Sequence, residues 1–160
     1  MQAEYLINTA LKMVNIYGRN DPFYAAKQEG ASVNFKDLGS LKGAYFGTMS
    51  TPAIVINENL DDTMKKVVCA HELGHHILHR KTTQSCDSTV FNGSNTGILE
   101  REANIFAAFY LIDKNTALEL LSNGNTIYQT AAILETDINL LSTMLNALNI
   151  ADAPNSNFLK

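Results

Sequence analysis

Two histidines and a glutamate lie within five residues of this chain, in the run His71-Glu72-Leu73-Gly74-His75. Histidines four residues apart lie about one turn apart on an α-helix, so both imidazoles can reach one tetrahedral metal ion. The carboxylate of Glu72, on the flank of the same face, stands where a general base would take a proton from water at the metal. The spacing therefore predicts a zinc hydrolase centre, with His71 and His75 as ligands and Glu72 as the base.

A catalytic zinc ion normally has three protein ligands and an open position for water, so a third side chain is required. His76 is expected to face solvent, about 100° round the helix from His75. His79 lies about 12 Å along the helix axis from His71, too far for one ion to bind all three histidines. Either His76 or His79, or a tyrosine, is a candidate proton donor to the developing oxyanion, and His79 is also a candidate substrate contact. The third ligand should be a carboxylate further along the chain.

Residues 98–113 form a second helical pattern that carries two glutamates. Glu100 lies about 60° from the centre of its apolar stripe, whereas Glu102 lies on nearly the opposite side. Glu100 is therefore the predicted third ligand. Asn104, one turn later, is a candidate to orient a ligand from behind. In the simpler alternatives, both carboxylates only solvate the first turn, and Asn104 is only a polar residue at the rim of the face.

Residues 61–80 read as the helix that carries the motif. Asp61 and Asp62 suit its positive N-terminus. Gly74 stands in mid-helix, where glycine costs about 1 kcal/mol relative to alanine, so we expect another backbone to approach closely there, at the metal. The apolar stripe of this helix borders both histidines and consists of Val67, Ala70, Leu73, Gly74, Ile77 and Leu78.

Three stretches give the chain a resemblance to the ImmA/IrrE-type metallopeptidases: TPAIVINENL (51–60), CAHELGHHILHR (69–80) and EREANIFAAFYL (100–111). A matching DPFYAAKQEG (21–30) precedes them. The family is similar in its core to thermolysin-like zincins, whose third ligand and the residue that supports it one turn later fall here on Glu100 and Asn104. The chain departs from the family where it reads Tyr-Leu-Ile-Asp at 110–113 instead of the usual Leu-Leu-Met-Pro.

This resemblance implies a zincin-like core and a zinc-dependent endopeptidase with one zinc ion. It also implies a narrow protein substrate, a helix-turn-helix repressor encoded nearby on a phage or integrative element, whose cleavage releases transcription. Two alternatives stay open. One is a binding module that regulates a repressor or toxin by docking, with zinc serving structure alone. The other is a metallohydrolase that acts on something other than a peptide.

The remaining pattern predicts an α+β fold, in which a small sheet of three strands packs on the two ligand-bearing helices. Strands are predicted where β-branched and aromatic residues cluster between Gly, Asp and Pro signals, at 32–35, 43–48 and 53–57. Zincins of this type place a strand beside the metal, where a substrate peptide adds to its edge. The last predicted strand, with Ile54, Val55 and Ile56, is the candidate for this edge, and the alternative is a central strand.

The chain reads as one metallopeptidase domain of 160 residues, of which 46% are hydrophobic and 18% charged. Its expected parts are N-terminal helices and sheet (1–60), the two zinc-binding helices (61–113), further helices (114–150) and a flexible tail (151–160). Neither a membrane span nor a secretion signal is recognisable. Cys69 and Cys86 form no disulfide framework, so a cytoplasmic location is expected.

The charge distribution argues against direct nucleic-acid binding. The net charge is −4, and residues 115–159 contain neither Lys nor Arg, whereas phosphate contacts need cations. The C-terminal helices are therefore expected to form a docking surface for another protein. The polar segment 81–97 is long for a connection. It reads as a flap near the cleft, with Phe91 as a candidate substrate contact, or as a plain surface excursion.

Overall fold

The structure is a computed structural model that describes residues 2–47, 50–80, 86–88 and 97–148, and only the backbone at 86–88. Helices and strands are combined as the α+β pattern predicts. Within these ranges, none of the helices has the length and apolar character that crossing a membrane requires. The elements in chain order are α1 (Ala3–Tyr17), α2 (Pro22–Gln28), β1 (Ser32–Lys36), β2 (Gly43–Phe46), β3 (Ala53–Asn57), α3 (Asp62–His79), β4 (Cys86–Ser88), α4 (Ile98–Leu111), α5 (Lys114–Ser122), α6 (Ile127–Ile133) and α7 (Ile138–Ala147).

Four strands form a mixed sheet in the order β1-β3-β2-β4. β1 runs parallel to β3, and β2 runs antiparallel to both β3 and β4. The three predicted strands are present. The fourth, β4, comes from the segment 81–97 that was expected to be a flap or a surface excursion. The rest of that segment, including Phe91, lies outside the described residues, as does the tail 151–160.

β3 occupies an interior position of the sheet, because it pairs with β1 on one side and β2 on the other. The prediction that this strand offers a free edge to substrate is therefore wrong, and the alternative of a central strand is correct. The side chains of Ile54 and Ile56 are fully buried, and Val55 is partly buried. A short run of β-branched residues fits an edge or a central strand equally well, so the sequence alone could not separate the two.

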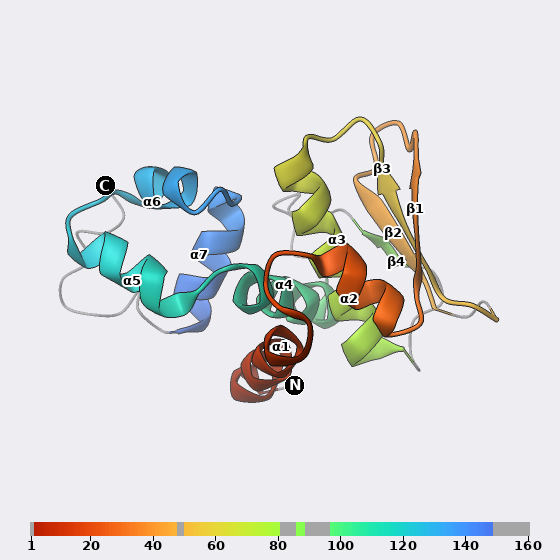
Figure 1. Cartoon of the computed structure of the whole chain (residues 1–160), viewed down its shortest axis with the longest axis horizontal. Coiled ribbons are helices and arrows are strands. Elements are labelled where there is room, and N and C mark those ends of the chain that lie inside the picture. Colours follow the sequence, from red (N-terminus) through yellow and green to blue (C-terminus); the bar gives the residue numbers. More distant parts are fainter. Residues whose placement is uncertain (1, 48–49, 81–85, 89–96, 149–160) are drawn as a thin grey trace.

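The helices that carry the motif residues lie in the middle of the molecule (Figure 1). The sheet lies at one end and α5, α6 and α7 lie at the other, with α3 and α4 between them. α3 packs against α4, α2 and the strands β2 and β3, while α4 also packs against α1 and α7. Because α3 has neighbours on most of its sides, every residue from Val67 to His76 is buried.

Local hydrogen bonds fix the ends of these two helices. The side chain of Asp61 caps α3 by accepting a hydrogen bond from Met64 N at 2.7 Å. At the other helix, the guanidinium of Arg19 donates to the carbonyls of the last turn of α4 and the residue that follows it, at 2.7–3.0 Å. These carbonyls have no partner within the helix, and a cation also suits the negative end of the helix dipole.

Gly74 allows the two central helices to approach closely. A Cβ atom built at this position would lie 3.1 Å from Ala103 Cα and 3.2 Å from Ala103 O of α4. Such distances are tighter than ordinary van der Waals contact. The prediction that another backbone lies against this glycine is therefore confirmed, and that backbone belongs to the helix that carries Glu100.

Candidate metal centre

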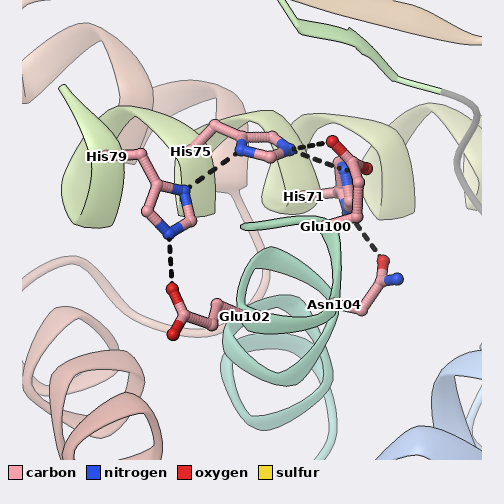
Figure 2. Close-up of polar contacts among 6 residues, drawn as sticks. All are labelled: His71, His75, His79, Glu100, Glu102 and Asn104. Carbon is pink, nitrogen blue, oxygen red and sulfur yellow. Dashed lines mark hydrogen bonds and ion pairs between the residues drawn. The ribbon is translucent and has the colours of Figure 1, made fainter. Parts of the chain in front are cut away.

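Three side chains from two helices converge on one point (Figure 2). α3 provides His71 and His75, and the first turn of α4 provides Glu100. The Nε2 atoms of the two histidines lie 3.1 Å apart. Glu100 places Oε2 at 3.2 Å from His71 Nε2 and Oε1 at 3.1 Å from His75 Nε2. Both imidazoles are fully buried, and the Glu100 side chain is 14% exposed.

The three side chains fit a divalent metal ion such as zinc. Two imidazoles and a carboxylate are a common donor set of catalytic zinc, and bond lengths of 2.0–2.1 Å would place the donor atoms of a tetrahedral site about 3.3 Å apart. The two Nε2 atoms are 3.1 Å apart and each lies 3.1–3.2 Å from a different oxygen of Glu100, which is close to this value, and one donor atom from each residue lies within 4.8 Å of the others. Within the described ranges, His71, His75 and Glu100 form a group able to hold a metal ion, as the sequence predicted.

Glu100 is ready to serve as an anionic ligand. Burial raises the pKa of its carboxyl, but the hydrogen bonds and the charge interactions with His71 and His75 together lower the pKa by more than burial raises it. The pKa of Glu100 is therefore held well below its ordinary range. The carboxylate stays ionised near neutral pH, which is the form that binds a cation.

Asn104 lies directly behind His71. Its Oδ1 accepts a hydrogen bond from His71 Nδ1 at 2.7 Å. Because an amide oxygen can only accept, His71 carries a proton on Nδ1, which leaves Nε2 as the nitrogen that would bind a metal ion. The residue one turn after Glu100 thus contacts a candidate ligand from behind, as the sequence indicated.

Glu72 follows His71 in α3 and is fully buried where that helix meets strand β2. A Cβ atom added to Gly43 of β2 would lie 3.3 Å from Glu72 Oε1 and would overlap the Val68 side chain. The strand can therefore approach the candidate base only because residue 43 is glycine. Gly43 was not among the predicted site residues, although a glycine in a strand is a known sign of close backbone approach.

His76 is buried, and the prediction that it faces solvent is wrong. Its Nε2 donates to Glu29 O at 2.9 Å, and its Nδ1 lies 2.9 Å from Tyr45 Oη, which donates to it. Burial lowers the pKa of His76, which favours the neutral ring that these two bonds require. The side of α3 opposite α4 is covered by α2 and β2, so His76 joins three elements rather than meeting water.

Glu102 is also buried, at 5% exposure, contrary to its predicted place on the far side of the helix from the apolar stripe. Its Oε2 lies 2.8 Å from His79 Nε2, and His79 Nδ1 lies 3.2 Å from His75 Nδ1 (Figure 2). His79 is only 2% exposed, and both its ring nitrogens face other side chains. The structure therefore places His79 behind a candidate ligand and not on a surface open to substrate.

The buried cysteine of the motif helix has no place in this centre. Cys69 is fully buried, and burial, together with the Glu72 carboxylate, raises the pKa of its thiol well above the ordinary value. The thiol therefore stays protonated, whereas metal binding needs a thiolate. The side chain of Cys86 lies outside the described residues.

The chain matches a known protein family. Residues 26–142 match the family description of the IrrE N-terminal-like domain, within the M78 peptidases. This range contains His71, Glu72, His75 and Glu100, together with the whole sheet. No curated protein matches the chain significantly.

Proposed function

The chain belongs to the IrrE N-terminal-like family of M78 peptidases, and we propose that it is a zinc-dependent endopeptidase. The proposal rests mainly on the convergence of His71, His75 and Glu100, in which each Nε2 atom lies 3.1–3.2 Å from the other and from one oxygen of the carboxylate. A metallopeptidase family and a group able to hold a metal ion support the same chemistry. The glutamate between the two histidines provides the base that such a hydrolase needs.

In this proposal, three side chains bind the metal ion and a fourth transfers protons. Bound zinc would supply Lewis acidity, making water more acidic and polarising the scissile carbonyl. His71, His75 and Glu100 hold the ion. Glu72 takes a proton from the attacking water and delivers it to the nitrogen of the leaving amine. The burial of Glu72 against β2 keeps its carboxylate in one place and excludes bulk water from it.

The proposed substrate is a helix-turn-helix transcriptional repressor, and the protein would act as a cytoplasmic anti-repressor from a mobile element. Two features support a protein partner over a nucleic acid: the net charge of −4, and the lack of Lys and Arg between residues 115 and 159. The helices α5, α6 and α7, which lie at the opposite end of the molecule from the sheet, would provide the docking surface (Figure 1).

A cleavage assay tests the activity and the substrate class together. Zinc-loaded protein is incubated with a panel of helix-turn-helix repressors encoded beside related peptidases, and the products are identified by intact mass. We expect one repressor to yield two fragments whose masses sum to the substrate plus one water. Unrelated folded proteins serve as controls, and cleavage should stop when a chelator is added. Intact repressors throughout the panel would contradict the proposed substrate class.

Zinc stoichiometry tests the ligand set separately from catalysis. We expect wild type and Glu102→Gln to retain about one zinc per chain after mild chelation and back-titration, whereas Glu100→Gln loses most of it. Both substitutions remove one carboxylate from α4, but only Glu100 faces the two Nε2 atoms, and the glutamine amide at position 102 keeps an oxygen that can accept from His79 Nε2. Elemental analysis provides the measurement. Loss of zinc from Glu102→Gln alone would show that the ligand is misassigned.

A further inference from the structure

Behind the candidate ligand His75 lies a buried chain of two further side chains (Figure 2). His79 Nδ1 lies 3.2 Å from His75 Nδ1, and Glu102 Oε2 lies 2.8 Å from His79 Nε2. The exposed fractions fall from 5% at Glu102 to 2% at His79 and 0% at His75. Because these side chains are buried, water does not compete for their hydrogen bonds. The donor and acceptor atoms of each bond therefore constrain which ring nitrogen carries a proton.

The carboxylate at the end of this chain sets the direction of the hydrogen bonds. The ionised oxygen of Glu102 can only accept, so His79 carries a proton on Nε2. A neutral His79 then presents a lone pair at Nδ1, which accepts from Nδ1–H of His75. With a proton held on Nδ1, His75 has Nε2, the nitrogen beside His71 and Glu100, as the atom that would bind the metal ion. Each bond in the series fixes the tautomer of the next ring.

The two histidine ligands are thus supported in parallel by one helix. Asn104 Oδ1 accepts from His71 Nδ1 at 2.7 Å, and Glu102 reaches His75 through His79. Both Asn104 and Glu102 belong to α4, the helix that also provides Glu100. The approach of α4 to α3 therefore sets the orientation of both imidazoles as well as the place of the carboxylate.

We propose that His79 and Glu102 are positioning residues that hold His75 in the tautomer and ring orientation of a metal ligand. The inference rests on the proposed zinc centre, and it assigns these two side chains to metal affinity rather than to substrate. Partners behind a histidine ligand typically contribute 10–100-fold in metal affinity. Because Glu102 acts on His75 only through His79, the effects of removing the two side chains should not add.

The test is a zinc competition assay with a chelating fluorophore on wild type, His79→Ala, Glu102→Ala and the double variant. We expect His79→Ala to weaken zinc binding about 10–100-fold. Glu102→Ala should weaken zinc binding by no more than His79→Ala does, and the double variant should match His79→Ala within about twofold. His79→Asn restores an acceptor near Nδ1, so its affinity should lie closer to that of wild type.

His76→Ala is the matched control. Like His79→Ala, it removes a buried imidazole of α3 that makes two hydrogen bonds. The partners of His76 are Tyr45 and the Glu29 carbonyl, so the contact between His79 and His75 is kept. Its zinc affinity should stay within about twofold of wild type, while thermal unfolding of the metal-free variants reports any general loss of stability. If His79→Ala and wild type bind zinc equally, or if His76→Ala weakens binding as much as His79→Ala, the positioning role is wrong. If wild type itself binds no zinc, the proposed centre fails and this inference fails with it.

Discussion

Glu72→Gln should abolish peptide cleavage while zinc remains bound. Glutamine matches glutamate in shape, so it fills the same space beside Gly43, but it cannot accept the proton that hydrolysis releases. Loss of a positioned general base typically lowers turnover by about 10²–10⁴-fold. Because Glu72 is not one of the three converging ligands, the zinc content should not change. Single-turnover cleavage of the identified substrate and elemental analysis of the same preparation measure the two effects.

Glu58→Gln is the charge-matched control, because Glu58 is an exposed carboxylate between β3 and α3. It should cleave at the wild-type rate. The decisive comparison is a cellular reporter of repressor activity with wild type, Glu72→Gln and Glu58→Gln. A reporter that responds equally to wild type and Glu72→Gln would refute the endopeptidase and favour the alternative of a non-catalytic module that acts by docking.

The ligands of this centre could be predicted from the sequence because their geometry is local. The i, i+4 spacing of His71 and His75 fixes their relation within one helix, whatever surrounds it. Glu100 follows from the apolar stripe of a second helix, since the stripe identifies the side that packs on the protein core. The same reasoning indicated Asn104, which is one turn further along that helix. Each of these predictions needed only the periodicity of one element.

The wrong predictions concern side chains that are buried by a structural element other than the one against which the apolar stripe packs. His76 and Glu102 both lie away from the apolar stripes of their helices, so each was expected to face water. α2 and β2 cover His76, and His79 meets Glu102, so both polar side chains are buried with partners. An apolar stripe identifies only one of the faces that a helix buries. The number of covered faces is set by long-range packing, which periodicity does not encode.

For a related reason, the sequence could not decide whether β3 is an edge strand or a central strand of the sheet. Ile54, Val55 and Ile56 suit a central strand and an edge strand equally well. The arrangement is decided by β1, which pairs in parallel with one side of β3, and by β2, which pairs with the other. Strand order is a property of the whole sheet, and short strands carry little information about it. The substrate-binding edge therefore could not be assigned from these three residues.

Gly74→Val should weaken both folding and zinc binding, because it forces apart the two helices that share the metal site. Even a Cβ at this position would lie 3.1 Å from Ala103 Cα, and the obstacle is backbone that cannot rotate away. Overpacking of this kind costs about 1–3 kcal/mol of folding free energy. Valine has a better helix propensity than glycine, but this gain is below about 1 kcal/mol and does not offset the clash. The free energy of unfolding of the metal-free protein, from urea titration, measures the first effect.

The loss of zinc affinity follows from the position of Gly74 between the ligands. A shift of α4 away from α3 moves Glu100 from the two Nε2 atoms and also lengthens the contacts of Asn104 and Glu102 behind the histidine rings. Lys66→Val, on an exposed side of α3, introduces the same residue without facing α4, so it should change unfolding by no more than about 0.5 kcal/mol and leave zinc binding intact. If Gly74→Val binds zinc as tightly as Lys66→Val, close approach of the two helices is not required for the site, and the ligands are held by their own helices alone.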